Sequence, residues 1–452
     1  MKYYSLNKKS PSVSFSQATI FGQAPDKGLY FPETIPKIDK EFIKNIEHLS
    51  NEEIAFLVIK PYIGNEIPDA ELQNMVNETV NFPIPLVPIH EHISSLELFH
   101  GPTLAFKDIG ARFMSRCLGY FIKDWGATNY LNRSKLVVLV ATSGDTGGAV
   151  ANGFYNVEGI EVVILYPSGK VSKVQEKQLT SLGNNIHALE VNGTFDDCQQ
   201  LVKQAFADEV LNKQLFLTSA NSINVARWLP QQFYYFFAYK QWKEKKYPPI
   251  FSVPSGNFGN ICAGILAHIS GLPVKHFIAA CNANDAVPKF MQTENYHPQK
   301  AIATISNAMD VGNPSNFIRI LELFQHKFPQ LKEKLSAYSI TDEETKATMK
   351  QVYSKYGYIL DPHGAVGYLA LERYLSSGDS TADFKDGSTS THSKGIILET
   401  AHPVKFYDVM EQVLHTTIEV PASVQAILNK TKQAVLMDAN YECLVEQLKK
   451  VS

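Results

Sequence analysis

The chain has 452 residues, 44% of them hydrophobic, which is enough for two or three domains with large buried cores. Its 42 basic and 45 acidic residues leave a net charge of -3, which argues against a nucleic-acid partner and favours a small-molecule one. No apolar run approaches the ~18 residues of a membrane span and the N-terminus lacks a signal-peptide pattern, so we expect a cytoplasmic protein without a membrane partner.

The first chemically suggestive stretch is HGPTLAFKDIGAR at 100–112, which places Lys107 behind a Gly-Pro turn and an apolar run. Lysines usually lie in water, and Lys107 can be an ordinary residue at the start of a helix. The alternative is a lysine in an apolar pocket, where desolvation lowers its pKa and frees a neutral amine for Schiff-base chemistry. This stretch alone leaves both possibilities open.

From about residue 136, short apolar strands alternate with amphipathic helices, which predicts parallel sheets covered by helices. KLVVLVA at 135–141 and IEVVILYP at 160–167 are expected to be strands of a first series. The aromatic segment 227–242 is expected to be a buried helix, and PIFSVP at 249–254 then begins a second series. Two α/β domains follow from this pattern.

Each series contains a strand that runs into a glycine turn and a helix. In SVPSGNFGN at 252–260, backbone amides at the start of the helix predict a phosphate site, although Ser255 or Asn257 could simply cap the helix. SGDTGG at 143–148 has the same layout, but the carboxylate of Asp145 would repel a phosphate. This second turn therefore favours a carboxylate or an amine of a substrate. Neither turn matches a P-loop or a dinucleotide fingerprint.

Near the C-terminal end, KGIILETAHPVKF at 394–406 is a strand followed by a polar turn, so the hydroxyl of Thr400 is expected at the same sheet edge. A helix-capping threonine is the alternative. A reactive lysine, a phosphate turn and a strand-end hydroxyl are the parts that a pyridoxal-phosphate site needs. The five cysteines are far apart and the histidines form no H-x-x-x-H pair, so no metal is expected.

Six motifs in order resemble the threonine synthase family: ELFHGPTLAFKDIGARFM, ATSGDTGGAVA, SVPSGNFGN, NAMDVGNPSNF, DPHGAVGY and TAHPVKF. The resemblance implies the fold-type II group of pyridoxal-phosphate enzymes, which includes the tryptophan synthase β-subunit. Its fold is α/β, with two parallel or mixed-sheet domains, the active site between them and an N-terminal segment. We expect an N-terminal segment at 1–90, a domain with the lysine and substrate loop at 91–225, and a phosphate-binding domain with a helical tail at 226–452.

The resemblance implies a lyase of threonine biosynthesis that converts O-phospho-L-homoserine and water to L-threonine and phosphate, by γ-elimination and β-addition of water. It assigns Lys107 to covalent attachment of pyridoxal phosphate and to proton transfer, and Thr400 to the pyridine nitrogen. The cofactor phosphate is assigned to Gly256, Asn257, Phe258 and Asn260. The substrate is assigned to Ser143, Gly144, Asp145 and Thr146, with Asn224 and Arg227 holding its phosphate.

Other activities of the same fold group are a serine or threonine deaminase and a phospholyase, which would release an unsaturated product instead of adding water. A ligand sensor without activity would have lost Lys107. The polar stretch 376–394 is expected to be a mobile surface loop. The sequence leaves the oligomeric state open between a monomer and a homodimer.

Overall fold

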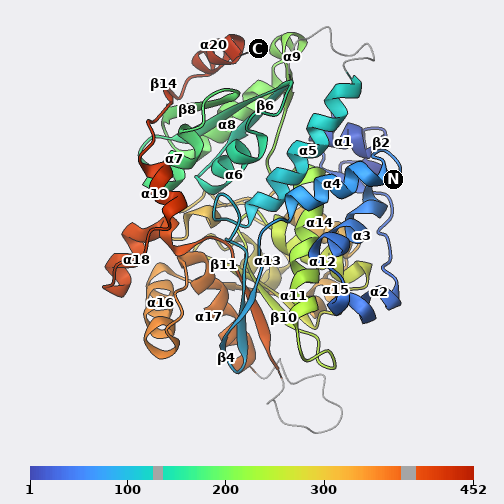
Figure 1. The fold of residues 1–452 in the computed structure, drawn as a ribbon, viewed down its shortest axis with the longest axis vertical. Coiled ribbons are helices and arrows are strands. Elements are labelled where there is room, and N and C mark those ends of the chain that lie inside the picture. Colours follow the sequence, from blue (N-terminus) through green and yellow to red (C-terminus); the bar gives the residue numbers. More distant parts are fainter. Residues whose placement is uncertain (126–135, 378–392, 452) are drawn as a thin grey trace.

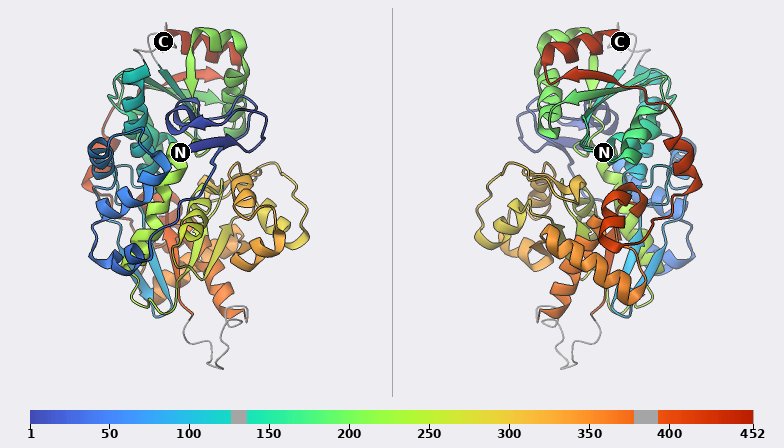
Figure 2. Two further views of the ribbon diagram at one scale, coloured as in Figure 1. Left: turned by 90° about the vertical axis from the view of Figure 1, so that its right-hand side faces the viewer. Right: turned by 90° about the vertical axis from the view of Figure 1, so that its left-hand side faces the viewer.

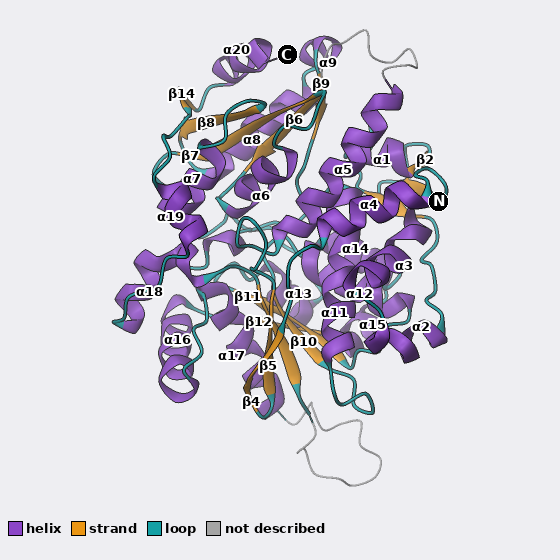
Figure 3. Ribbon diagram, viewed as in Figure 1, coloured by secondary structure: helices purple, strands orange, loops and turns teal. Residues whose placement is uncertain are grey.

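The structure is a computed structural model that describes residues 1–125, 136–377 and 393–451. Its described strands form three sheets of six, five and three strands. The five-stranded sheet lies at the top of the view in Figure 1 and the six-stranded sheet at the bottom, each with helices packed around it. Figure 3 shows the same separation, with the two groups of strands in orange and helices between them.

The six-stranded sheet is parallel except for its edge strand β4, which pairs antiparallel with β5. Its strands, in spatial order, are β12 (Leu335–Ser339), β11 (His276–Cys281), β10 (Ile250–Pro254), β13 (Gly395–Glu399), β5 (Ile93–Glu97) and β4 (Leu86–His90). Every residue of β10, β11 and β13 is buried, as expected for parallel strands covered on both faces. The helices of this part are α11 (Phe233–Gln241), α12 (Gly259–Ser270), α13 (Ala286–Thr293), α14 (Phe317–Leu323), α15 (Phe328–Lys334), α16 (Asp342–Tyr356), α17 (Pro362–Ser376) and α18 (Tyr407–Leu414).

The five-stranded sheet is entirely parallel. Its order is β14 (Val435–Asp438), β8 (Ile186–Asn192), β7 (Ile160–Pro167), β6 (Leu136–Ala141) and β9 (Phe216–Thr218). The expected strands at 135–141 and 160–167 are thus confirmed over their described residues. The helices are α5 (Lys107–Trp125), α6 (Asp145–Phe154), α7 (Lys173–Thr180), α8 (Phe195–Ala207), α9 (Glu209–Gln214), α19 (Ala422–Leu428) and α20 (Tyr441–Val451).

The N-terminal part adds a small antiparallel sheet and four helices. Its elements are β1 (Lys2–Ser5), β2 (Val13–Ser14), α1 (Phe15–Phe21), β3 (Tyr30–Pro32), α2 (Lys40–Asn45), α3 (Asn51–Ile63) and α4 (Asp69–Thr79). Helices α1 and α4 pack on α5, and Figure 2 shows the small sheet, in dark blue, beside the five-stranded sheet. None of the described helices has the length and apolar character to cross a bilayer.

The aromatic segment at 227–242 is buried, as expected, but it is not one helix. It divides into α10 (Val225–Trp228), a 3-10 turn (Leu229–Gln232) and α11. Pro230 lies in the 3-10 turn, where its missing amide and fixed φ interrupt a continuous α-helical ladder. Both α10 and the 3-10 turn pack on α5.

Two strands depart from the consecutive domains predicted from the sequence. Strand β5 belongs to the predicted domain 91–225 but pairs with β13, and β14 belongs to the predicted domain 226–452 but pairs with β8. Among the described strands, the chain passes between the two larger sheets three times: from β5 to β6, from β9 to β10, and from β13 to β14. The expected polar loop at 376–394 falls mostly on 378–392, outside the described residues.

Candidate active site

The turn before α5 brings Lys107 next to the end of β13. The amide of Phe106 donates to the Thr400 carbonyl at 2.9 Å, and the amide of His402 donates to the Leu104 carbonyl at 3.0 Å. Leu104 adopts a left-handed conformation with φ of 58°, which is costly for a residue with a Cβ and is held by these bonds. Lys107 therefore starts its helix beside Thr400.

The carboxylate of Asp108 fixes the same turn from inside. It accepts the amide of Thr103 at 2.9 Å and its hydroxyl at 2.5 Å, and both residues are buried. Burial raises the pKa of Asp108, although the two Thr103 hydrogen bonds oppose this rise. The turn that carries Lys107 is thus held from both sides.

The ammonium end of Lys107 lies away from water, although the residue as a whole is partly exposed. The pKa of Lys107 is lowered to about 8: burial is the largest cause, the charge of Asp145 opposes it, and the charges of Lys405 and Arg227 add to the lowering. Its amine forms no hydrogen bond within the described ranges, and it lies 5.6 Å from the centre of the Phe106 ring. Lys107 thus begins a helix, as the first possibility has it, and also has the desolvated amine that the second requires.

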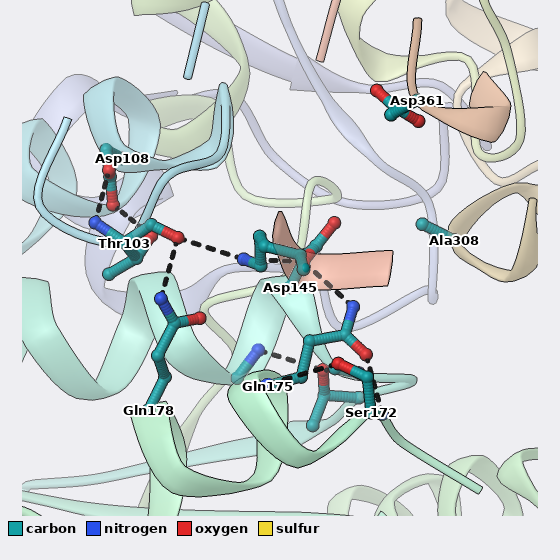
Figure 4. A network of polar contacts seen from close by, with 12 residues as sticks. Thr103, Asp108, Asp145, Ser172, Gln175, Gln178, Ala308 and Asp361 are labelled. Atoms are coloured by element: carbon teal, nitrogen blue, oxygen red, sulfur yellow. Dashed lines mark hydrogen bonds and ion pairs between the residues drawn. The ribbon is translucent and has the colours of Figure 1, made fainter. Parts of the chain in front are cut away.

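Asp145, the first residue of α6, forms a buried ion pair with Lys405. Its carboxylate lies 2.7 Å from Lys405 Nζ and accepts a hydrogen bond from Gln175 at 2.9 Å. Lys405 also donates to the Thr103 carbonyl at 2.9 Å, and Figure 4 shows Thr103 and Gln175 on two sides of Asp145. Burial alone would raise the pKa of Asp145, but Lys405 and Lys107 outweigh it and hold the pKa well below its usual range.

Sequence reasoning missed Lys405, which is fully buried at the centre of this cluster. The signal was present: a lysine inside the apolar run HPVKF, directly after a strand end. The sequence assigned the Asp145 carboxylate to the substrate, whereas here it serves an internal ion pair. Ser143, Gly144 and Thr146 lie with it at the start of α6, where the Thr142 hydroxyl accepts the amide of Gly144 at 2.9 Å.

The predicted phosphate turn lies at the carboxyl end of β10, at the N-terminus of α12. Phe258 is left-handed with φ of 60°, and in the part of the chain that the structure describes the amides of residues 256–260 donate to no protein acceptor. The side chain of Asn257 braces the turn, since it donates to Ser222 Oγ at 2.8 Å and accepts the amide of Ser315 at 2.6 Å. The Nδ2 of Asn260 is buried and has no hydrogen-bond partner in the described part of the chain.

Gly256 allows the phosphate turn to lie against the chain at 308–309. A Cβ at Gly256 would lie 2.6 Å from Met309 Cα and 3.1 Å from the Ala308 carbonyl oxygen, distances that only a glycine permits. Because β10 and β13 are neighbours in the sheet, this turn and Thr400 emerge at the same edge.

The hydroxyl of Thr400 is not a helix cap. The following 3-10 helix (Pro403–Phe406) is capped by His402, whose Nδ1 accepts the amide of Val404 at 3.1 Å. Burial lowers the pKa of His402 to about 4, which keeps its ring a neutral acceptor. Thr400 is 6% exposed, and its hydroxyl makes no hydrogen bond among the described residues.

The two residues assigned to the substrate phosphate differ in what their side chains are free to bind. Asn224 is already used, since it accepts the amide of Ala226 at 3.0 Å and donates to the Thr19 carbonyl at 2.8 Å. Arg227 is 3% exposed, and its Nε and Nη1 have no hydrogen-bond partner among the described residues. Burial lowers the pKa of Arg227 to about 10, so it remains charged. Unpaired buried guanidinium nitrogens are uncommon and indicate a ligand or water.

No group of histidine, cysteine, aspartate and glutamate within the described ranges is arranged to hold a metal ion.

Three family models match the chain: "Pyridoxal-phosphate dependent enzyme" at residues 88–383, "Threonine synthase N terminus" at 2–80 and "Threonine synthase, C-terminal" at 365–448. The chain is 43% identical over 93% of its length to a threonine synthase of Serratia marcescens and to one of Escherichia coli, covering 92% and 93% of those proteins.

Solved structures give the same result for the fold. The crystal structure of threonine synthase from Escherichia coli matches with a TM-score of 0.90 and 40% identity, covering the whole of both chains. A pyridoxal-phosphate-bound threonine synthase from Brucella melitensis matches with a TM-score of 0.89 and 34% identity, covering 100% of this chain and 99% of that one. A processed threonine deaminase from Solanum lycopersicum shares the fold alone, at 14% identity and a TM-score of 0.52.

Proposed function

Since this chain belongs to the threonine synthase family and is a pyridoxal-phosphate-dependent lyase, we propose that it converts O-phospho-L-homoserine and water to L-threonine and phosphate at the site around Lys107. The observation that carries the proposal is the meeting of three groups at one sheet edge. These are the desolvated amine of Lys107, the unpaired amides of residues 256–260 and the unpaired hydroxyl of Thr400.

The residues of this edge fit pyridoxal phosphate. Backbone amides at the start of α12, with the helix dipole behind them, suit its phosphate, and Asn260 Nδ2 offers one more buried donor. Thr400 offers a neutral hydroxyl to the pyridine nitrogen, and Lys107 offers the amine that attaches the aldehyde. When bound, the cofactor supplies an electron sink that stabilises negative charge on the substrate carbons next to the amino group.

Lys107 acts as the proton carrier of the reaction. With a pKa of about 8, a useful fraction of its amine is neutral near neutral pH, so that it can take a proton from the substrate and return it. The Asp145–Lys405 pair adds one negative and one positive charge beside it, which keeps the local net charge low while Lys107 changes its protonation state.

The substrate's two anionic ends are proposed to bind in different places. We assign its carboxylate to the amides and hydroxyls of residues 143–146 at the start of α6, where the helix N-terminus favours an anion. We assign its phosphate to Arg227, whose two unpartnered nitrogens can donate hydrogen bonds to two phosphate oxygens at once. Asn224 is left out of this assignment because its amide is already paired.

Water must be excluded while phosphate leaves and admitted afterwards, because early water would divert the reaction. The glycine-rich turn at 143–148 is our candidate for this control, since it carries the proposed carboxylate site and can respond to the substrate. We also propose a cytoplasmic location, supported by five cysteines that are all unpaired, as expected in a reducing compartment.

The test is to incubate the purified holoenzyme with O-phospho-L-homoserine and to measure threonine and inorganic phosphate together. We expect the two products in a one-to-one ratio. Free homoserine should be a poor substrate, because hydroxide leaves less readily than phosphate and Arg227 would lack its ligand. Phosphate release with 2-oxobutyrate and without threonine would replace this function with a lyase that does not add water.

A further inference from the structure

Two motifs of the sequence, DPHGAVGY and NAMDVGNPSNF, have no task in the proposed reaction. In the structure they meet next to the end of β13. Asp361 caps α17 from the first motif, and Glu399, the last residue of β13, is beside it: the Asp361 amide donates to Glu399 Oε1 at 2.7 Å. Both residues are fully buried, and Glu399 directly precedes Thr400 in the sequence.

This carboxylate pair contains one oxygen on each side without a partner. Among the residues that the structure describes, Glu399 Oε2 and Asp361 Oδ2 are buried and find no hydrogen-bond partner when both groups are ionised. Within the described ranges no lysine or arginine forms an ion pair with either. The other titratable groups around the pair are Glu97, on the neighbouring strand, and Tyr358, with the imidazoles of His363 and His402 on the Asp361 side, so no lysine or arginine of the described residues offsets the pair. Two bare carboxylates in such a place repel each other, whereas one proton between them gives both oxygens a partner.

The pKa of Glu399 supports the same assignment. Burial, and then the charge of Asp361, raises it well above its ordinary value, and a hydrogen bond between the two side chains contributes to the rise. The proton therefore belongs on Glu399, which then acts as a hydrogen-bond donor.

The hydrogen bonds continue from Asp361 to His363. Asp361 Oδ1 lies 2.6 Å from His363 Nδ1, and the amide of Ala308 donates to His363 Nε2 at 3.2 Å. Since a backbone amide can only donate, Nε2 is the acceptor and Nδ1 carries the hydrogen that points to Asp361. The series has one consistent arrangement of protons: the Glu399 hydroxyl and the His363 ring both donate to Asp361, and Ala308 donates to His363.

Ala308 and Met309 are the residues against which Gly256 of the phosphate turn lies. The hydrogen bonds thus begin beside Thr400, which is assigned to the pyridine end of the cofactor, and end behind the turn assigned to its phosphate.

We propose that Glu399 is protonated and that the series Glu399, Asp361, His363 and Ala308 positions the cofactor's two anchoring points relative to each other. These are positioning residues, since none of them is placed against the cofactor itself. The inference rests on the assignment of residues 256–260 to the cofactor phosphate in the proposed function.

The test measures pyridoxal-phosphate affinity of the apoprotein by absorbance titration, which needs no turnover. His363→Phe keeps a ring against Phe406, whose centre is 5.0 Å away, and removes both hydrogen bonds. We expect its affinity to fall by about tenfold, the effect of losing hydrogen bonds of which one involves a charged group. Glu399→Gln keeps a donor toward Asp361 and should stay within about twofold of the parent, whereas Glu399→Leu removes the donor and should behave like His363→Phe.

Two reference variants separate this inference from the proposed function. His276→Phe removes a partly buried hydrogen bond to Ser336 Oγ of 2.8 Å at the opposite end of the sheet, and should leave cofactor affinity unchanged. Gly256→Ala should weaken binding, because its Cβ collides with Met309. If Gly256→Ala weakens binding but His363→Phe does not, or if Glu399→Gln is as weak as Glu399→Leu, the positioning series is refuted alone. If Gly256→Ala and His363→Phe both bind pyridoxal phosphate with the affinity of the parent, the positioning series is refuted together with the assignment of residues 256–260 to the cofactor phosphate.

Discussion

Two buried carboxylate clusters lie beside the proposed cofactor site, and they are in opposite states. Asp145 has Lys405 at 2.7 Å and Lys107 nearby, and its pKa is held well below the usual range. Glu399 instead has the carboxyl groups of Asp361 and Glu97 as neighbours, and burial followed by the charge of Asp361 raises its pKa well above normal. Both residues are almost completely buried. The comparison teaches that burial alone leaves a carboxyl group protonated, and that a lysine in direct contact is what keeps Asp145 ionised.

Lys107→Ala removes the reactive cation from the first cluster and should have the largest effect. Turnover of O-phospho-L-homoserine should fall by about 10³-fold or more, because both covalent attachment and proton transfer are lost. The visible absorbance of the attached cofactor should disappear, as measured on the dialysed protein. If borohydride still links the cofactor to another lysine, the assignment of Lys107 is wrong.

Lys405→Met removes the difference between the two carboxylate clusters, because Asp145 then loses the cation in contact with it and resembles Glu399. Removing one partner of a buried ion pair should lower the free energy of unfolding by about 3–5 kcal/mol, as measured by urea denaturation at pH 7.

The matched control for this variant adds Asp145→Asn, which removes the stranded charge and should recover most of the lost stability. A single variant within 1 kcal/mol of the parent, with the double variant no better, would show that the ion pair contributes little to stability.

Glu399→Gln tests the protonation state of the second cluster. A carboxyl group whose folded pKa is raised takes up a proton on folding, so its contribution to stability falls as pH rises from the unfolded pKa toward the folded one. Glutamine carries no such dependence. The variant should therefore gain stability over the parent by about 1.4 kcal/mol for each pH unit in that interval.

The measurement is thermal or urea unfolding of both proteins between pH 5 and 8. The gain should grow with pH because only the parent loses stability through this group. An unchanged difference across the range would mean that Glu399 is ionised in the folded state.

Thr400→Ala has the smallest expected effect, because it removes one neutral hydrogen bond to the cofactor. Cofactor binding should weaken by about 0.5–1.5 kcal/mol, measured by titration of the apoprotein, and turnover should fall further. Thr400→Ser keeps the hydroxyl and is the control. Equal affinity, spectrum and turnover in Thr400→Ala and the parent would place the pyridine nitrogen elsewhere.

Local sequence patterns predicted the elements that depend on neighbouring residues. The strand expected at 160–167 is β7, and the turns at 143–148 and 252–260 both follow strands and open helices. The hydroxyl of Thr400 emerges at a strand end as expected. These features could be found because alternation, glycine and strand length are recorded within a few consecutive residues.

Long-range partners could not be predicted in this way. Nothing in β5 or β14 shows that they pair across the expected domain boundaries, since any apolar strand could occupy those positions. The same limit applies to Lys405, whose partner Asp145 is 260 positions away in the chain, and to the proton on Glu399, which depends on which charges the fold brings near it. Protonation follows from three-dimensional neighbours rather than from residue type.

The three passages of the chain between the larger sheets have a mechanical consequence. Lys107 lies on the first passage, Arg227 on the second, and Thr400 with Lys405 on the third. The connectors that would act as hinges therefore carry the proposed reactive groups. A rotation of one sheet against the other must turn these connectors, and so it changes the distances among the amine, the guanidinium and the hydroxyl. Any movement that opens or closes the space between the two sheets would therefore also rearrange the proposed active site.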